Sequence, residues 1–318
     1  LFMEPFYGGS HRDFASGWAA HSRHQIDLVT LPSRFWKWRM RGASLWFADK
    51  VRDAGNYDLI VCSGLMDIAA LKSLLPGPLP PLLLYAHETQ LSYPQPNSSE
   101  ADLHFAFTDV VNMLSVDHVA FNSHTHRASF LDQLPAFLRS FPENRPMWAV
   151  QSIRRRSSVC YPGIALGSVP DPAQRDDEPP LIIWNHRWEF DKGPDSFFSA
   201  LRAAKQQGAR FRLALLGENF KTVPAAFVEA RDVFSREIVH YGYVAERTEY
   251  ERWLSRGALV VSTAIQENFG ISVMEAIAHG CRPLLPNRLS YPELIPEDFH
   301  PACLYDSEEE LVSILVSR

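Results

Sequence analysis

Short apolar runs recur along the whole chain, and segments in which apolar residues have helical spacing separate them. This alternation predicts βαβ units and parallel sheets, so the expected fold class is α/β with doubly wound sheets. A first strand ends near residue 4. Further strands are expected at 26–31, 58–63, 82–87, 118–122, 158–161, 181–185, 211–217, 238–243, 258–262 and 282–286.

The length of 318 residues is enough for two domains that each bury a core. Residues 163–180 are rich in Pro, Gly, Asp and Ser and show no periodicity, which is typical of a linker. We therefore expect one Rossmann-like domain over residues 1–165 and a second over 166–318, facing each other across a central cleft.

Composition limits the class of protein. Hydrophobic residues make up 46% and charged residues 21%, which is typical of a soluble globular protein, and no apolar run is long enough to span a membrane. Residues 1–165 carry 15 Lys+Arg against 14 Asp+Glu and the remainder 16 against 23, so the balances are +1 and −7. This asymmetry favours the N-terminal half as the face for a polyanionic partner.

The four cysteines, at positions 62, 160, 281 and 303, are scattered and form no C-x-x-C pair. Zinc and disulfide frameworks are therefore not expected, and a reducing compartment such as the cytoplasm fits best. Cys62 and Cys160 lie in apolar segments and are expected in the core. His124 and His126 have no third ligand at a metal-site spacing, so we expect no metal. The chain starts within its first strand, so we expect a few residues to be missing before Leu1.

Two carboxylates, Glu267 and Glu275, follow the apolar run at 258–261. A turn at Phe269-Gly270 separates them, and the residues beyond it have helical spacing. In open α/β sheets, ligands bind beyond the carboxyl ends of the strands, against helix N-termini. The pattern therefore indicates a ligand site, and the alternative is a pair of solvated carboxylates. Glu275 has apolar neighbours, where a carboxylate needs a hydrogen-bonding partner.

Arg187 and Lys192 follow the strand expected at 181–185, and Gly193-Pro194 predicts the start of a helix. Two cations on such a loop suit a diphosphate, because Arg offers a planar fork, Lys a point charge and the helix amide donors. The alternative is two solvated cations. A Glu-bearing loop on a neighbouring strand favours the ligand site.

Polar residues also follow the strands of the first half. Gly8-Gly9 comes directly after the first strand, where paired glycines let the backbone approach a phosphate, although a plain tight turn is the alternative. His87-Glu88 ends the strand at 82–87, and the cluster from Asn122 to Arg127 ends the next one. Both clusters are expected to line one edge of the first sheet.

The segment 34–41 interleaves four cations with three aromatic residues. Cations suit phosphates, while aromatic and guanidinium faces stack on unpaired bases, so the segment is a candidate RNA-binding surface. The alternative is an amphipathic helix whose aromatic side chains pack inward and whose cations are solvated. Both interpretations stay open at this point.

These motifs resemble those of the retaining GT-B glycosyltransferases that carry an E-x7-E motif. More narrowly, F-Y-G-G-S-H (6–11), L-P-S-R-F-W-K-W-R (31–39), A-H-E-T-Q-L-S-Y-P (86–94) and three further segments (184–194, 262–276, 282–294) resemble the tRNA-queuosine α-mannosyltransferase family. The resemblance implies a GT-B fold with an N-terminal acceptor-side domain and a C-terminal nucleotide-sugar-binding domain. It also implies transfer of a hexose, mannose from GDP-mannose, to queuosine in a tRNA anticodon, without a metal.

The resemblance also implies roles for individual residues. Arg187 and Lys192 would hold the donor diphosphate and stabilise the charge that builds on it, and Glu275 would accept hydrogen bonds from the donor ribose. The implied catalytic residues are His87, Arg187, Lys192 and Glu267. The other implied donor-binding residues are Gly8, Gly9, Tyr243, Val244, Phe269, Gly270, Ile271 and Glu275. The implied acceptor and RNA contacts are Ser10, His11, Arg34, Trp36, Lys37, Trp38, Arg39, Arg41, His87, Glu88, Asn122, His124 and Arg127.

Such enzymes retain configuration by same-face attack, with the leaving phosphate accepting the proton of the nucleophile, so no side chain needs to form a covalent bond. Two alternatives stay open. The first is a glycosyltransferase that acts on a glycan, a lipid or a small molecule. The second is a non-catalytic protein that binds RNA or a nucleotide sugar. The sequence leaves the donor nucleotide, the hexose, the tRNA and the oligomeric state undetermined.

Overall fold

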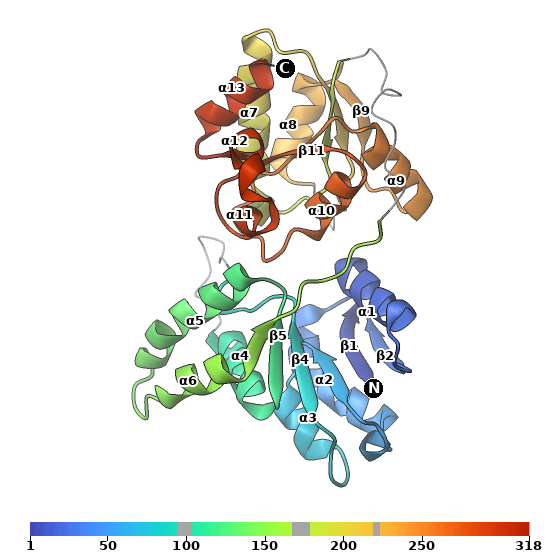
Figure 1. Cartoon of the computed structure of the whole chain (residues 1–318), viewed down its shortest axis with the longest axis vertical. Helices are drawn as coiled ribbons and strands as arrows, with labels where there is room; N and C mark the ends of the chain where they lie inside the picture. The colour runs from blue at the N-terminus through green and yellow to red at the C-terminus, as the bar shows by residue number, and fades with distance from the viewer. Residues whose placement is uncertain (94–102, 167–178, 219–222, 318) are drawn as a thin grey trace. The chain divides into compact units, whose positions relative to one another are not determined.

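The computed structural model describes residues 1–93, 103–166, 179–218 and 223–317. They form two compact units, Leu1–Gly163 (unit 1) and Ile164–Arg318 (unit 2), which Figure 1 shows as two sheets flanked by helices. Most of the linker expected at 163–180 lies outside the described residues, as does Pro94 of the motif at 86–94.

Unit 1 contains a parallel sheet of six strands in the order β2-β1-β3-β4-β5-β6. The strands are β1 (Phe2–Tyr7), β2 (Leu28–Pro32), β3 (Ile60–Ser63), β4 (Leu82–Ala86), β5 (His118–Phe121) and β6 (Ser157–Val159). The main helices are α1 (Gly9–His21), α2 (Trp36–Lys50), α3 (Ile68–Leu74), α4 (Leu103–Ser115), α5 (His124–Arg139) and α6 (Trp148–Arg155). The predicted parallel strands are confirmed, except that β1 continues to Tyr7 and the prediction that it ends near residue 4 is wrong.

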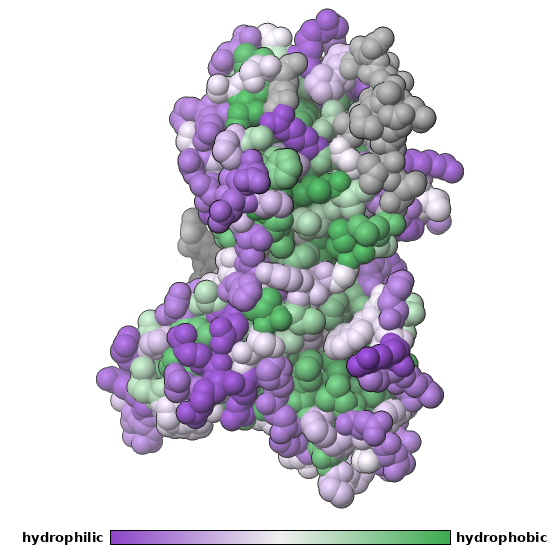
Figure 2. All heavy atoms as spheres, viewed as in Figure 1, coloured by the Kyte–Doolittle hydropathy of each residue, from purple (hydrophilic) through white to green (hydrophobic). Residues whose placement is uncertain are grey.

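Helices cover both faces of this sheet because successive strand residues point to opposite sides. Met3 and Cys62 pack in a core that includes residues of α2 to α6, whereas Phe2 and Val61 pack against Phe14 of α1. The outer surface over α5 and α6 is mostly hydrophilic (Figure 2). The prediction for Cys160 is wrong. This residue is exposed, because it follows β6, which is bonded on one side only at the sheet edge.

Unit 2 contains a second parallel sheet of six strands, in the order β12-β11-β10-β7-β8-β9. The strands are β7 (Leu181–Trp184), β8 (Arg212–Leu215), β9 (Ile238–Tyr241), β10 (Leu259–Val261), β11 (Arg282–Pro286) and β12 (Leu304–Tyr305). The helices are α7 (Pro194–Gln206), α8 (Ala225–Val233), α9 (Arg247–Arg256), α10 (Ile271–Ala278), α11 (Tyr291–Leu294), α12 (His300–Cys303) and α13 (Glu308–Val316). The sequence did not predict β12, because two residues are too short to show a period.

The core of unit 2 also lies on both sides of its sheet. Trp184 of β7 packs with Phe197 of α7 and Phe227 of α8 on one side. Ile183, the preceding residue, packs with Val273 of α10 on the other side. The predicted doubly wound architecture is therefore confirmed for each unit.

The strand order reverses at one place in each sheet, and the candidate sites lie at these two places. The chain of unit 2 runs from β7 outward through β8 to β9, and then returns to β10 on the other side of β7. In unit 1 the reversal lies between β1 and β3. Open α/β sheets bind ligands beyond the carboxyl ends of the strands at such a reversal. Among the described residues, no helix has the length and apolar character that crossing a bilayer requires.

Candidate active site

The loops after β7 and β10 meet at the reversal of the strand order in unit 2, and they carry Lys192 and Glu267. Lys192 ends the short 3-10 helix η3 (Phe190–Lys192). Its Nζ donates to the Gln266 carbonyl at 2.8 Å and to Glu267 Oε2 at 3.2 Å, and it lies 3.2 Å from Asp191 Oδ2. The structure therefore brings together two residues that the sequence placed only on neighbouring loops.

The electrostatics of this group keep both partners ionised. Burial opposes the charged form of Lys192, but the carboxylates of Glu267 and Asp191 more than offset it and raise the lysine pKa. Burial likewise opposes ionisation of Glu267, yet the charge of Lys192 lowers the carboxyl pKa. Burial first, and the lysine charge second, lower the pKa of the adjacent His186 to about 4, so this imidazole is neutral. The result is a fixed, largely buried cation.

Arg187 lies nearer the solvent than Lys192. Its Nη1 is 3.2 Å from Glu189 Oε2, and 44% of its side chain is exposed. The charge of Arg187 acts to lower the pKa of Lys192, and so it opposes the rise that Glu267 and Asp191 cause. The predicted pair of cations therefore consists of one buried and one accessible group.

The second predicted carboxylate, Glu275 on α10, is buried and has the partners that its surroundings require. Arg247 Nη1 donates to Glu275 Oε1 at 2.6 Å, and the Tyr250 hydroxyl donates to Oε2 at 3.1 Å. Asn185 Nδ2 donates to the same tyrosine oxygen at 2.8 Å. Burial opposes the charge on Arg247, but Glu275 and then Glu251 raise its pKa, so the ion pair persists.

Sequence reasoning missed Arg247 and Tyr250. Both lie on α9, three positions apart, so they share one face of that helix. This spacing was the available signal, but it does not reveal that α10 is the element they face.

The turn between the two carboxylates is as predicted. Gly270 has φ 99° and caps α10, and a Cβ there would lie 3.2 Å from the ring of Tyr291, so glycine is required. The Ser290 hydroxyl donates to the Phe269 carbonyl at 2.9 Å and holds the turn. The first amides of α10, starting at Ile271, have no partner within the helix, and this makes the helix start suitable for an anion.

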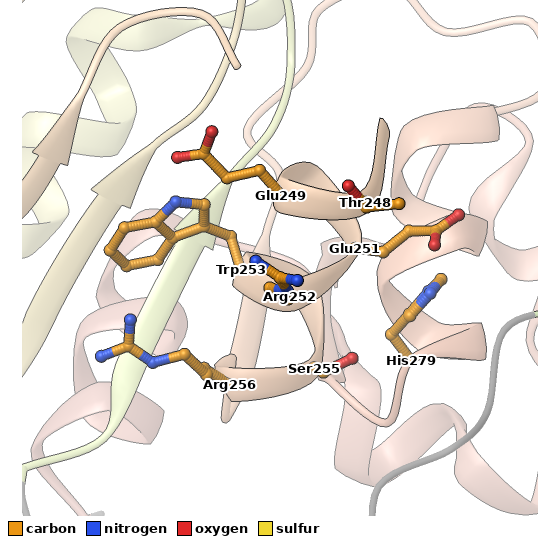
Figure 3. Close-up of a pocket in the computed structure, with 8 residues that line it drawn as sticks. All are labelled: Thr248, Glu249, Glu251, Arg252, Trp253, Ser255, Arg256 and His279. Atoms are coloured by element: carbon orange, nitrogen blue, oxygen red, sulfur yellow. The ribbon is translucent and has the colours of Figure 1, made fainter. Parts of the chain in front are cut away.

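The predicted base-binding residues follow β9. Tyr243 is 57% exposed, while Val244 is buried in the core of unit 2. A hollow of about 600 Å³ lies nearby along α9, where Trp253, Arg256 and His279 belong to its lining (Figure 3). None of the predicted donor-binding residues lines this hollow, so we assign it no part in the site.

In unit 1, the loop after β1 carries Gly8 and Gly9. A Cβ on Gly8 would lie 2.0 Å from Ser33 Oγ, so the loop packs too closely for a side chain there. Gly9 begins α1, followed by Ser10, which is exposed, and His11. His11 Nδ1 lies 3.2 Å from Glu4 Oε1, and His87 Nε2 lies 3.8 Å from Glu4 Oε2.

The sequence did not predict the contribution of Glu4. The available signal was a carboxylate inside an apolar strand, where burial demands hydrogen-bonding partners.

The loops after β4 and β5 are joined by side chains. Asn122 Nδ2 donates to the His87 carbonyl at 2.9 Å, and Asn122 Oδ1 lies 2.8 Å from His126 Nδ1. Burial lowers the pKa of His126 to about 3, so this imidazole is neutral. Glu88 Oε1 accepts from Gln90 Nε2 at 3.2 Å. Asn122 therefore positions the loop that carries His87.

The two other predicted acceptor contacts of this cluster have different surroundings. His124 is exposed at the start of α5. Arg127 Nε donates to Ser157 Oγ at 2.9 Å, and its Nη2 donates to the Arg154 carbonyl at 2.9 Å. Arg127 thus links α5 to β6 and α6.

Asp109 of α4 holds the loop after β4, because its Oδ2 accepts from the Gln90 amide at 2.6 Å. Burial raises the pKa of this carboxyl to about 8. Between the ordinary carboxyl pKa and this value, the folded state therefore holds a proton that the unfolded state has lost. Stability must consequently fall as the pH rises through this window.

We expect Asp109→Asn to weaken this dependence. The wild type should lose about 1–3 kcal/mol more than the variant in its free energy of unfolding between about pH 5 and about pH 8. Urea unfolding at both pH values measures the difference. Asp132→Asn, at an exposed position on α5, is the control and should behave like the wild type. Equal pH dependence in Asp109→Asn and wild type would refute the prediction.

The structure divides the segment 34–41 between the two alternatives, a packed helix and an exposed surface that could bind RNA. Trp36 packs inward, with its ring 5.3 Å from that of Phe105. Phe35 and Trp38 are 70% and 68% exposed. Phe35 has φ 55° and ψ 49°, a left-handed conformation that is unusual for an aromatic residue. The Arg34 guanidinium lies 5.9 Å from the Phe35 ring.

The other cations of this segment lie along the start of α2. Lys37 Nζ is 5.6 Å from the Trp36 ring, Arg39 Nη2 donates to the Pro32 carbonyl at 3.2 Å, and Arg41 is 3.9 Å from Asp67 Oδ2. Lys37 and Arg41 are exposed, as is Arg34. Two exposed aromatic rings and three exposed cations therefore lie within this one short segment.

Comparison with known proteins agrees with this architecture. Residues 1–164 match the family model of the tRNA-queuosine alpha-mannosyltransferase N-terminal domain, and residues 169–312 match that of the group 1 glycosyl transferases. The tRNA-queuosine alpha-mannosyltransferase of Drosophila melanogaster is 31% identical over 309 residues, which cover 94% of this chain and 82% of that protein.

Two solved structures show the same fold. Sucrose-phosphate synthase from Thermosynechococcus elongatus is similar with a TM-score of 0.70 at 14% identity, over 99% of this chain and 88% of that one. Anabaena Alr3699/HepE in complex with UDP is similar with a TM-score of 0.67 at 15% identity, over 100% of this chain and 88% of that one.

Two doubly wound units, with a match to group 1 glycosyl transferases in the second, define a glycosyltransferase of the GT-B fold. The match of the first unit and the likeness to the fly protein narrow this class further. The chain belongs to the tRNA-queuosine alpha-mannosyltransferase family. The fold, the enzyme class and the family that the sequence indicated are therefore confirmed.

Proposed function

We propose that this enzyme transfers mannose from GDP-mannose to queuosine in the anticodon of a tRNA, with retention of configuration. The observation that carries the proposal is the similarity to the fly tRNA-queuosine alpha-mannosyltransferase over 94% of the chain. The arrangement of Lys192, Glu267 and Glu275 in unit 2 supports the donor part.

On the donor side, Lys192, Arg187 and the start of α10 would bind the diphosphate. Lys192 is already held by two carboxylates, so it needs no reorganisation when charge develops on the leaving phosphate. These cations supply the positive charge, and our scheme therefore includes no metal. Glu267 would contact hydroxyls of the hexose, and Glu275, oriented by Arg247 and Tyr250, those of the ribose.

In the reaction, an acceptor hydroxyl would attack the anomeric carbon on the face that the phosphate leaves. The new carbon–oxygen bond forms as the bond to phosphate breaks, and the leaving phosphate takes the hydroxyl proton. Glu267 and Glu275 do not act as the acid and nucleophile of a glycosidase, since Lys192 and Arg247 already engage them as charged partners.

On the acceptor side, we propose that Phe35 and Trp38 stack on unpaired bases of the anticodon loop, while Arg34, Lys37 and Arg41 contact its phosphates. This assignment fits the exposure of both rings and the cations beside them. Trp36, Arg39, Glu88 and Arg127 would support this surface through the protein contacts they already make.

We expect Phe35→Ala and Trp38→Ala each to weaken tRNA binding by about tenfold, because stacking contributes about 1–3 kcal/mol per base. Binding of an anticodon stem-loop at one fixed salt concentration measures this effect. Leu45→Ala is the matched control, since Leu45 is an exposed apolar residue on the same helix and should not matter. Unchanged affinity in both aromatic variants would remove these residues from the RNA site.

Incubation with queuosine-containing tRNA and several nucleotide sugars tests the function itself. The expected result is that the queuosine nucleoside gains the mass of one hexose, with GDP-mannose the best donor. The absence of hexose on the RNA under every donor would reject the acceptor assignment. In that case, transfer to a glycan or small molecule would favour another acceptor. The absence of both transfer and donor hydrolysis would favour a non-catalytic protein.

A further inference from the structure

A buried carboxylate and two imidazoles form a cluster in unit 1 that the sequence motifs did not reveal. Glu4 lies on β1 and Ser63 ends β3, so both lie where the strand order reverses. His11 is on the first turn of α1, and His87 directly follows β4. The cluster therefore occupies the ligand-binding position of this sheet.

Glu4 is fully buried, and three neighbours lie within hydrogen-bonding distance of its oxygens. The Phe6 amide donates to Glu4 Oε1 at 2.8 Å, and Ser63 Oγ donates to Oε2. His11 Nδ1 lies 3.2 Å from Oε1. Oε1 has two lone pairs, so it can accept from the Phe6 amide and from His11 Nδ1 together, and we take Nδ1 as the donor. These contacts offset the cost of burying the carboxyl group.

The two imidazoles lie against each other. Their ring centroids are 4.0 Å apart, and the planes are tilted by 34°. Burial, and then the proximity of His11, lower the pKa of His87 well below its ordinary value, so His87 is neutral. When His11 is neutral as well, its proton lies on Nδ1 towards Glu4, and Nε2 carries the lone pair. Glu4 thus determines which nitrogen of His11 accepts a hydrogen bond.

The chemistry of the cluster selects its ligand. A carboxyl group beside a neutral imidazole repels a phosphate, but it suits an uncharged hydroxyl group, which both donates and accepts hydrogen bonds. We propose that Glu4, His11 and His87 form the binding site for the attacking hydroxyl of the acceptor diol, with Glu4 as the positioning residue for both imidazoles. This inference rests on the proposed function for the identity of the diol.

In this site His11 Nε2 accepts a hydrogen bond from the hydroxyl and fixes the direction of the oxygen lone pairs. The proton itself leaves with the phosphate, as described above. A divalent cation is the competing occupant, because the ligand atoms of Glu4, His11 and His87 lie within 4.8 Å of one another.

The test compares Glu4→Gln with the wild type in two reactions. Transfer to queuosine tRNA should fall at least about tenfold in kcat/KM for the RNA. Hydrolysis of the donor by water and donor affinity should not change, because Lys192, Glu267 and Glu275, which we assign to the donor, are all in unit 2. Asp13→Asn, which removes an exposed carboxylate from the same helix α1, is the control and should transfer like the wild type.

A spectroscopic readout separates positioning from general damage. In protein with ¹⁵N-labelled histidine, His11 should show a protonated Nδ1 in the wild type and a changed tautomer in Glu4→Gln. If Glu4→Gln does not fold, His11→Asn provides the same comparison of transfer with hydrolysis, since it leaves the buried carboxyl in place. His11→Asn should lose transfer and keep hydrolysis.

Three results would overturn the inference. They are wild-type transfer by Glu4→Gln, an equal loss of transfer and hydrolysis in a folded variant, and one equivalent of divalent metal in the wild type that Glu4→Gln lacks. Failure of the proposed function would look different, because the wild type itself would then add no hexose to the RNA.

Discussion

Replacement of Lys192 with alanine is expected to lower kcat for hexose transfer by about 10²–10³-fold. The Nζ of this residue is a buried charge held at 3.2 Å from both Glu267 and Asp191, so no mobile group can replace it at the leaving phosphate. Donor hydrolysis should fall with transfer, because both reactions break the same bond. Hydrolysis that persists while transfer is lost would place Lys192 on the acceptor side instead.

The same substitution is expected to destabilise unit 2. It leaves Asp191 and Glu267 buried without their cation, and breaking a buried ion pair in this way costs about 3–5 kcal/mol. Lys192→Met combined with Asp191→Asn and Glu267→Gln removes all three charges, so it should recover much of the stability and none of the activity. Arg202→Met on α7, which removes an exposed ion pair with Glu229, is the control. Urea unfolding measures each variant.

The pH dependence of this ion pair has a definite sign. The pKa of Glu267 is lowered, so its contribution is present above the ordinary carboxyl pKa and is lost as the pH falls through the lowered value. The pKa of Lys192 is raised, so its contribution is present below the ordinary lysine pKa and is lost above the raised value. The stabilisation by the pair therefore spans the whole neutral range.

Glu275→Ala is expected to raise KM for the donor by about 10–100-fold, since a hydrogen bond to a charged group contributes about 1.5–3 kcal/mol. The variant removes the acceptor that we assign to the ribose and frees Arg247 from its closest carboxylate. Calorimetric titration with GDP and with UDP should show equal losses, because both nucleotides contain the same ribose.

Glu251→Gln is the matched control for this prediction. It removes the other carboxylate that contacts Arg247 but leaves the pair with Glu275 intact. Its donor KM should therefore stay close to that of the wild type. A loss confined to one of the two nucleotides in Glu275→Ala would show instead that this position contacts the base.

Much of the fold could be predicted from local sequence. The apolar run before residue 262 and the helical spacing after Gly270 were sufficient to predict β10, the turn and α10, because burial imposes a period on each element. The apolar neighbours of Glu275 predicted that it needs a partner. They did not predict which residue that partner is, because periodicity identifies the buried face of an element and not the element that covers it.

The segment 34–41 is a second case in which local sequence did not predict which element covers a residue. Its composition suited both a packed helix and an RNA surface, and the structure divides it between them. Trp36 packs against Phe105 of α4, while Phe35 and Trp38 face solvent. Neighbouring residues on a helix point in different directions, so only the position of α4 decides which ring is covered.

The sequence by itself determined that this chain forms two doubly wound parallel sheets and that its carboxylates and cations lie on the loops that follow their strands. Only the tertiary structure decided which of these groups meet. Lys192 pairs with Glu267 although 75 positions separate them, and Glu4 meets His87 because only β3 lies between β1 and β4. Local sequence cannot predict these meetings, because strand order is a property of the whole sheet and depends on how all its strands and helices pack together.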